Sequence, residues 1–142
     1  MTATKFIDSN IFFYAKIMDR KYGAACARIL RWIDSGDIAA ATSALAIIEV
    51  ANALRKYGLS DEVKNVIDAM LSLEISILQV DSTDVRRGVD IFNISRISPY
   101  DCIHAAVMNK AGIKEIISAD KEFDKVAAIT RLDPLQLSTA NG

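Results

Sequence analysis

The sequence predicts an α/β fold, in which a mostly parallel sheet is covered by helices on both faces. Short apolar segments typical of strands alternate along the chain with segments in which apolar residues recur at helical spacing. The strand segments are apolar nearly throughout, as in parallel strands that are buried on both faces. With 142 residues, the chain is long enough for one domain with a full core.

Composition narrows the class of protein. Half of the residues (51%) are hydrophobic and 25% are charged, which is ordinary for a globular domain, and no apolar run is long enough to cross a membrane. The chain opens directly into a strand segment, so we expect no secretion and a cytoplasmic location without membrane contact. Cys26 and Cys102 are far apart and fit buried free thiols in a reducing compartment.

The first half of the chain is predicted to contain two strands and four helices. Cys26, Ile29 and Ile33 form an apolar stripe at helical spacing, and Gly58 is placed to end a later helix. In order, the elements are a strand over residues 4–7, a short buried helix opening at residue 11, a helix over 22–34, a strand over 38–41, a helix over 44–57 and a helix over 63–71.

The second half is predicted to add three strands. The strand over residues 75–80 is apolar enough to be largely buried, and the helix that follows it should bury Val85, Val89 and Phe92. A helix over 99–111, a strand over 115–119, a helical turn over 121–124 and a strand over 128–132 complete the order. We therefore expect a single domain over residues 1–135 and a loose tail over 136–142.

The helix that starts near residue 98 carries a candidate functional acid. Ser98 suits the N-cap position and Pro99 the first helical position, which leaves Asp101 among free N–H groups at the positive end of the helix dipole. Ser-x-x-Asp is also the pattern of a capping box, so Asp101 has a purely structural alternative.

Three other acids are predicted to lie at the same edge of the sheet. Asp8 and Asp120 follow directly after buried strands, and Glu49 lies in the second turn of a helix that also follows a strand. Helices that leave strands at the carboxyl edge begin there, so these three carboxylates and that of Asp101 can converge on one cleft.

Each of these acids has an alternative role that the sequence leaves open. Asp8 could form an Asx turn with Ser9 and Asn10, and Asn10 is itself a further candidate for the site. Glu49 could be solvated, and Asp120 could cap the helical turn that follows it. Asp124 could be a further metal ligand or could lie on the solvent face of that turn.

Electrostatics indicates what four converging acids require. Two carboxylates about 4 Å apart repel each other by roughly 4 kcal/mol at an effective dielectric near 20, so four need a compensating charge. Oxygen ligands favour a hard divalent ion, Mg²⁺ or Mn²⁺, and there is no Cys/His set for zinc. Such an ion can activate a water molecule to attack a phosphodiester.

His104, the only histidine, follows Asp101 by three residues and can share its helix face. A metal-ligand or proton-transfer role and a supporting role, in which it is hydrogen-bonded or packed beside the ligands, both remain open. Because the net charge is −1, contacts to nucleic-acid phosphates would need a local set of cations. The exposed candidates are Lys16, Arg20, Lys21, Arg55, Lys56 and Arg96.

At these motifs the sequence resembles the PIN-domain family, and in particular VapC-type toxin ribonucleases. The resemblance extends from Phe6 to Pro134. It rests on residues 6–10 (Phe-Ile-Asp-Ser-Asn), on Thr42-Ser43 followed by Glu49, on residues 99–106 around Asp101, and on residues 117–124 around Asp120. The motifs are short individually, but their order and spacing together are specific.

The resemblance implies a PIN-like three-layer sandwich, with a central five-stranded parallel sheet between helices, and Mg²⁺- or Mn²⁺-dependent endoribonuclease activity. Asp8, Glu49, Asp101 and Asp120 match the acidic positions of the family, and Asp124 matches an acid that only some members have. Ser43, or Thr42, matches a hydroxyl that lines the site. The resemblance also implies a homodimer and an antitoxin partner over the apolar surface near Phe12, Phe13 and the helix that carries Glu49.

Several functions are compatible with these features. The favoured one is a metal-dependent endoribonuclease that acts as the toxin of a toxin–antitoxin pair. Alternatives are a PIN-domain nuclease of RNA processing and an inactive PIN-like module that only binds a partner or RNA. Phosphatases and receiver-like modules often carry a close Asp-x-Asp pair, whereas Asp8-Ser9-Asn10 lacks the second acid.

Overall fold

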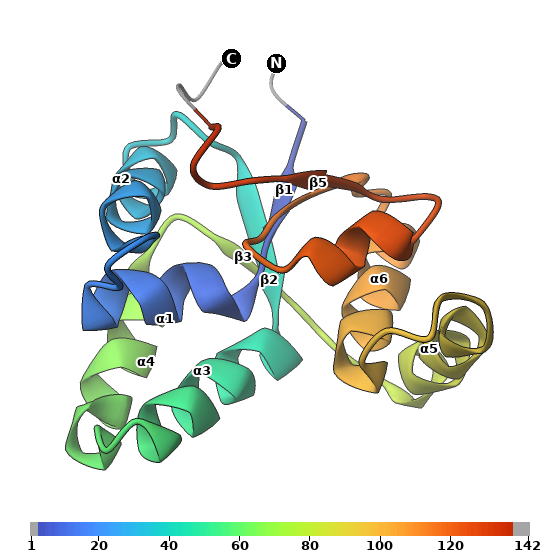
Figure 1. Ribbon diagram of the computed structural model, residues 1–142, viewed down its shortest axis with the longest axis horizontal. Coiled ribbons are helices and arrows are strands. Elements are labelled where there is room, and N and C mark those ends of the chain that lie inside the picture. Colours follow the sequence, from blue (N-terminus) through green and yellow to red (C-terminus); the bar gives the residue numbers. More distant parts are fainter. Residues whose placement is uncertain (1–2, 138–142) are drawn as a thin grey trace.

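A five-stranded parallel sheet forms the centre of the protein. The computed structural model describes residues 3–137, and the strands occur in the spatial order β3-β2-β1-β4-β5 (Figure 1). Every neighbouring pair is parallel. The predicted α/β class and the parallel five-stranded sheet are therefore confirmed. The strands are β1 (Lys5–Ile7), β2 (Ala40–Ser43), β3 (Ser76–Leu78), β4 (Glu115–Ile117) and β5 (Thr130–Leu132).

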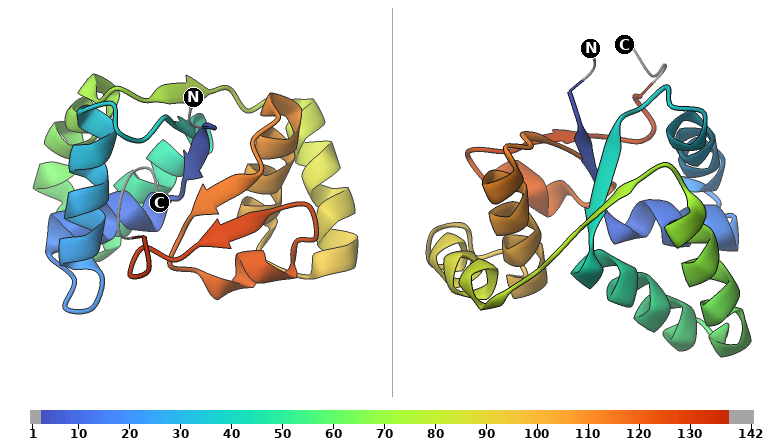
Figure 2. Two further views of the ribbon diagram at one scale, coloured as in Figure 1. Left: turned by 90° about the horizontal axis from the view of Figure 1, so that it is seen from above. Right: turned by 180° about the vertical axis from the view of Figure 1, so that it is seen from behind.

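Helices cover both faces of this sheet, so the domain has three layers. Helices α1 to α4 pack on one side, and α5 and α6 lie on the other, as the two views in Figure 2 show. The α-helices are α1 (Ser9–Ile17), α2 (Gly23–Asp34), α3 (Ala44–Lys56), α4 (Val63–Ser72), α5 (Ser82–Ser95) and α6 (Pro99–Ala111), and the 3₁₀ turns are η1 (Ser60–Glu62) and η2 (Lys121–Lys125).

Alternation along the central strands gives each face its own core. On β1, Ile7 packs with the helices of the first face, whereas Phe6 packs with α6 and η2 on the second. On β4, Ile117 and Ile116 divide in the same way. All four side chains are fully buried, because side chains along a strand point alternately to opposite faces and both faces are covered.

The strand order reverses between β1 and β4. The chain builds outwards from β1 through β2 to β3, and then returns to place β4 on the other side of β1. Ligands of open α/β sheets bind beyond the carboxyl ends of the strands at such a switch point. The Asp8 N–H donates to the Ile117 carbonyl (3.1 Å), so the segment after β1 is fastened to the end of β4 at this place.

The fourth and fifth strands are each two residues shorter than predicted, and two other strands differ in position or burial. The second strand spans Ala40–Ser43 instead of 38–41, because its bounds follow from pairing with β1 (Lys5 with Ala40, Phe6 with Ala41) and not from the propensities of its own residues. The third strand is short and lies at the edge of the sheet, and Ile77 remains 37% exposed. The expectation that it is largely buried is therefore wrong.

The buried face of α5 also differs from the prediction. Val85 and Val89 are 46% and 55% exposed, whereas Asp84 and Gly88 are buried. A Cβ on Gly88 would lie only 3.0 Å from Ile103 Cγ1, so glycine permits the close approach of α5 to α6. Asp84 accepts a hydrogen bond from Lys110 Nζ (2.7 Å) at the same contact. Because these two contacts place Asp84 and Gly88 against α6, Val85 and Val89 lie at the edge of the interface between α5 and α6.

The end of the described chain is folded. Leu137 is 8% exposed and belongs to the core of the first face, and its N–H donates to the Asp133 carbonyl (3.2 Å). Residues 136 and 137 thus belong to the folded part and not to the predicted tail, and residues 138–142 of that tail lie outside the described residues. Within residues 3–137, no helix is both long and apolar enough to cross a membrane.

Candidate functional site

Asp8 lies at the centre of the candidate site. It follows β1 directly, is only 4% exposed, and caps α1 by accepting a hydrogen bond from the Ser9 N–H (2.8 Å). Its other carboxylate oxygen accepts hydrogen bonds from Ser118 Oγ (2.6 Å) and Asn10 Nδ2 (3.2 Å). The local contacts of Asp8 are therefore to the Ser9 N–H and the Asn10 side chain, and not the bond to the Asn10 backbone N–H that defines an Asx turn. With Ser118 they hold a buried carboxylate in one orientation at the switch point.

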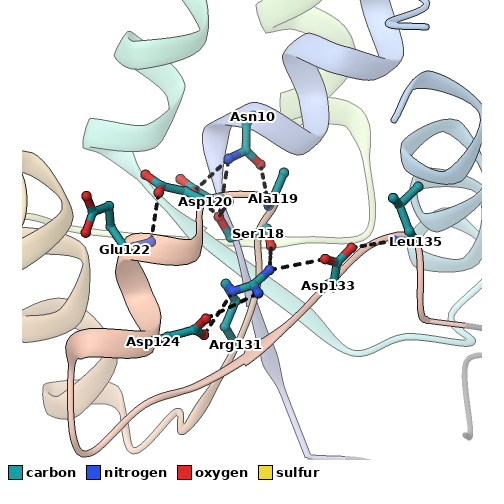
Figure 3. Close-up of polar contacts among 10 residues, drawn as sticks. Asn10, Ser118, Ala119, Asp120, Glu122, Asp124, Arg131, Asp133 and Leu135 are labelled. Atoms are coloured by element: carbon teal, nitrogen blue, oxygen red, sulfur yellow. Dashed lines mark hydrogen bonds and ion pairs between the residues drawn. The ribbon is translucent and has the colours of Figure 1, made fainter. Parts of the chain in front are cut away.

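Ser118 connects the ends of β1 and β4. Its buried hydroxyl donates to Asp8 and accepts hydrogen bonds from the Asp120 N–H (3.0 Å) and Asn10 Nδ2 (3.2 Å). Asn10 also accepts a hydrogen bond from the Ala119 N–H (3.4 Å), as Figure 3 shows. Sequence reasoning did not single out Ser118, although a hydroxyl two residues before Asp120, at the end of a strand next to β1, was an available signal.

Glu49 meets His104 across the gap between α3 and α6. His104 is fully buried, and its Nε2 lies 2.6 Å from Glu49 Oε1, the distance of a charge-assisted hydrogen bond in which the imidazole donates. On the other side of the ring, Nδ1 lies 3.4 Å from Ser43 Oγ. Glu49 is therefore held by a specific partner and is not merely solvated.

Ser43, and not Thr42, supplies the hydroxyl next to this histidine. Ser43 ends β2 and caps α3 by accepting a hydrogen bond from the Ala46 N–H (3.1 Å). The Thr42 hydroxyl instead donates to the carbonyl of Ile7 (2.8 Å) and ties β2 to β1. The two neighbouring hydroxyls thus have different roles, which the sequence pattern left open.

The structure brings the four predicted acids into one electrostatic cluster. One ligand atom each from Asp8, Glu49 and His104 lie within 4.8 Å of one another. The pKa of Asp101 is raised to about 8, chiefly by burial and then by the charges of Asp8, Asp120 and Glu49, against the opposing effect of His104. Burial likewise raises the pKa of Asp8, and the Glu49 charge adds to it.

The histidine partly compensates these acids. Burial by itself would lower the pKa of His104, but the hydrogen bond to Glu49 and the charges of Asp8, Glu49 and Asp101 more than offset it, so its pKa is raised. No Lys or Arg within residues 3–137 forms an ion pair with Asp8, Glu49, Asp101 or Asp120.

The capping-box alternative for Asp101 does not form. Ser98 occupies the N-cap position of α6, yet it makes no side-chain capping hydrogen bond within the described structure. A capping box forms at α5 instead, where Asp81 and Asp84 each bond the backbone N–H of the other (3.1 and 2.9 Å). The carboxylate of Asp101 is thus available to the acidic cluster.

Asp120 and Asp124 lie in different environments. Asp120 caps η2 by accepting a hydrogen bond from the Glu122 N–H (2.9 Å), and its charge also acts on Asp101. Asp124 instead accepts two hydrogen bonds from the Arg131 guanidinium (3.0 and 3.4 Å). Asp120 therefore belongs to the acidic cluster, whereas Asp124 forms an ion pair with Arg131.

Arg131 is a second residue that sequence reasoning missed. Besides Asp124, its guanidinium bonds the Ser118 carbonyl (3.0 Å) and contacts Asp133 Oδ2 (3.5 Å), as Figure 3 shows. Three partners from the turn after β4, from η2 and from the segment after β5 are thus joined by one side chain. This network supports the turn that carries Ser118 and Asp120.

The donor set fits a hard divalent cation. It consists mainly of carboxylate oxygens, one of them fully surrounded by protein and already oriented by Ser118 and Asn10. Carboxylates with raised pKa values indicate negative charge that the protein does not neutralise by itself. Carboxylate oxygens are the ligands that Mg²⁺ and Mn²⁺ prefer.

The raised pKa of Asp101 predicts a pH-dependent stability in chelator. Its value near 8 in the folded protein exceeds its ordinary 3.8, so the folded state holds the proton more tightly and stability falls as pH rises from about 4 to 8. Asp101→Asn should reduce this fall, so that the variant melts above wild type at pH 8.5 but not at pH 4. Thermal melts across this range measure it.

The raised pKa of His104 makes a contribution of the same sign, which should persist in the variant. Mn²⁺ at pH 8.5 should raise the melting temperature of wild type more than that of Asp101→Asn. A wild type whose stability in chelator is independent of pH, together with a less stable variant, would show that Asp101 is only a structural acid.

Comparisons with known proteins agree with this architecture. The chain is 26% identical over 127 residues to Ribonuclease VapC13 of Mycobacterium tuberculosis, which covers 89% of this chain and 97% of that relative. The structure of M. tuberculosis VapC20, described as a Sarcin-Ricin loop cleaving toxin, matches with a TM-score of 0.74 at 16% identity, over 88% of this chain and 95% of that one.

A DNA-bound complex, VapBC2 from Rickettsia felis, contains a chain that matches with a TM-score of 0.69 at 13% identity, over 91% of this chain and 97% of that one. At these identities the solved structures establish the fold. The family model described as PIN domain matches residues 5–129, a span that includes all four clustered acids, and the chain therefore belongs to the PIN domain family.

Proposed function

We propose that this protein is a metal-dependent endoribonuclease that hydrolyses RNA phosphodiester bonds as the toxin of a toxin–antitoxin pair. The observation that carries the proposal is the cluster of Asp8, Glu49 and His104 at the switch point. Asp101 is close enough that the charges of Asp8 and Glu49 act on it, and its pKa is raised to about 8. Such uncompensated acids destabilise a fold unless a cation offsets them, and they are typical of functional sites.

The cofactor in this proposal is Mg²⁺ or Mn²⁺. Asp8, Asp101 and Asp120 would bind it directly, and Glu49 either directly or through water. When bound, such an ion polarises the scissile phosphate and lowers the pKa of a water molecule that attacks it. The side chains of this protein would orient the ion and the RNA phosphate beside it at the edge of the sheet.

Other polar residues have supporting roles in the proposal. Ser118 and Asn10 donate hydrogen bonds to Asp8 Oδ2 and thereby set the orientation of Asp8 Oδ1. His104 holds Glu49 in place through its hydrogen bond to Oε1. Hydrogen bonds from neighbouring residues that orient metal ligands are general features of metal sites. Ser43 contributes by capping α3, the helix that carries Glu49, and Asp124 contributes through Arg131.

The toxin role is supported by the relatives and by an apolar surface. The curated relative is named a ribonuclease, and one structural neighbour is a VapBC complex. A cavity of about 350 Å³ opens between α1, α2 and α4, lined by Phe12, Leu30 and Met70 among others. This surface includes one of the two phenylalanines predicted to contact an antitoxin, so we propose it for that partner. A homodimer remains part of the proposal.

Metal binding distinguishes the roles of Asp120 and Asp124. If Asp120 is a ligand, Asp120→Asn should weaken Mn²⁺ binding about tenfold or more. Asp124→Asn should weaken it by less than about threefold, because Asp124 is bound to Arg131. Titration calorimetry with the metal-free protein measures both. Equal weakening would assign Asp124 to the metal shell.

The nuclease activity is tested with purified protein and a radiolabelled RNA. Cleavage should require Mg²⁺ or Mn²⁺ and stop in chelator. Asp8→Asn and Asp101→Asn should each lower turnover at least about 100-fold while the proteins remain folded, because both side chains are ligands in the proposal. Lys64→Gln, at an exposed position on α4, serves as the control. Undiminished cleavage by both acid variants would refute the assignment.

The role of His104 is tested by two variants of similar size. His104→Gln keeps a donor that can approach Glu49, whereas His104→Leu does not. If His104 only positions Glu49, His104→Gln should retain Mn²⁺ binding and much of the activity, and His104→Leu should lose about 10- to 100-fold. Melting temperatures show whether the fold survives. A loss in both variants as large as in Asp8→Asn would make His104 a ligand or proton donor.

A further inference from the structure

A groove opens directly beside the acidic cluster, between α3 and the start of α6. It has a volume of about 570 Å³, within the range of cavities that bind small organic ligands. Its wall on α3 includes Leu45, Ile48, Glu49, Asn52 and Lys56, and Tyr100 lines it from α6. Glu49 belongs to both the groove and the cluster, so an extended ligand lying in the groove would reach the acidic site.

We propose that this groove binds an unpaired nucleotide of the RNA substrate, with the base on Tyr100 and a flanking phosphate at Lys56. The inference rests on the proposed function and extends it, because it assigns substrate recognition to residues outside the acidic cluster.

Tyr100 is placed to bind a base. It precedes Asp101 in the first turn of α6, and it is 58% exposed although its neighbour in sequence belongs to the acidic cluster. An aromatic ring stacks on any unpaired base, whereas the bases of an A-form duplex are stacked on each other and their deep groove is closed to side chains. An RNA that uses this ring must therefore present a base outside a helix.

The α3 wall offers both apolar and polar groups. Ile48 is 64% exposed and, with Leu45, gives an apolar surface on the α3 side of the groove, while the Tyr100 ring lines the α6 side. Asn52 lies one turn further along the same helix face, where its amide can bond a base edge or sugar. This mixed lining suits a nucleotide better than it suits a purely apolar ligand.

Lys56 supplies a positive charge at the far end of the groove. It lies seven residues, about 10 Å of helix, beyond Glu49 on the same face of α3. Within residues 3–137 it forms no ion pair, whereas Lys16 and Lys64 pair with Glu62 and Asp68. The groove thus has acids for a metal at one end and a free cation for a phosphate at the other.

Binding can be measured separately from hydrolysis. Fluorescence anisotropy in chelator at low salt would follow a labelled, unstructured RNA octamer, alone or annealed to its complement. Tyr100→Ala should weaken binding of the single strand by about tenfold, corresponding to a stacking contribution of about 1.4 kcal/mol, and should leave the duplex unaffected. Tyr100→Phe keeps the ring and should bind like wild type.

Lys56→Gln should weaken binding and reduce the slope of log affinity against log salt by about one, because one phosphate contact is removed. Lys64→Gln, which removes an 85%-exposed lysine of α4 outside the groove, and Ile94→Ala, which trims a 90%-exposed side chain of α5, should change neither property. Melting temperatures confirm that each variant is folded.

Three results would contradict the proposal that the groove binds RNA. They are undetectable RNA binding by wild type, unchanged affinity of Tyr100→Ala, and equal losses of affinity in Tyr100→Ala and Tyr100→Phe. Light scattering, which measures the oligomeric state, can give a fourth such result. If wild type is a dimer and Tyr100→Ala is a monomer, the groove face is an interface with a second copy of the chain and not an RNA site. Cleavage of the octamer with Mn²⁺ is measured separately. If the protein binds RNA through Tyr100 but does not cleave it, the proposed nuclease activity is refuted while the proposed RNA-binding groove is retained.

Discussion

The burial of several mutually repelling carboxylates at the carboxyl end of β1 is the constraint on which the rest of the site depends. Asp8 is buried there, and Asp101, Glu49 and Asp120 are close enough that their charges act on one another. Hydrogen bonds from Ser118 and Ser9 and the charge of His104 offset only part of this cost for Asp8. No Lys or Arg among the described residues forms an ion pair with these acids. The fold tolerates the cost because the two cores of the sheet hold the elements that carry the acids in place.

The residues around the acids determine their orientation. Ser118 and Asn10 hold Asp8, His104 holds Glu49, and Arg131 binds the turn after β4 that carries Ser118 and Asp120. Two of these contacts, Ser118 with Asp8 and His104 with Glu49, join segments that are more than fifty residues apart in sequence. The side chains proposed as metal ligands are therefore already oriented by hydrogen bonds, which would lower the cost of ordering them around an ion.

Two of the acids proposed as metal ligands also have structural roles. Asp8 caps α1 and Asp120 caps η2, while both also act on the charge of Asp101. A helix that begins at the edge of a parallel sheet has its free N–H groups and its positive dipole end at that edge, where ligands bind. Capping and metal binding are thus not exclusive alternatives for such residues, whereas for Asp101 the capping contact is absent from the described structure.

The order of strands and helices determined the fold class from sequence, because buried parallel strands need apolar residues on both faces and helices need a repeating stripe. It also placed Asp8, Glu49, Asp101 and Asp120 at one edge, since that edge follows from strand direction alone. The sequence did not determine that Asp124 faces Arg131, that Ser118 bonds Asp8, or that Asp84 and Gly88, not Val85 and Val89, form the buried face of α5. These outcomes depend on which surfaces approach each other across long separations in the chain, and only the tertiary packing decides that.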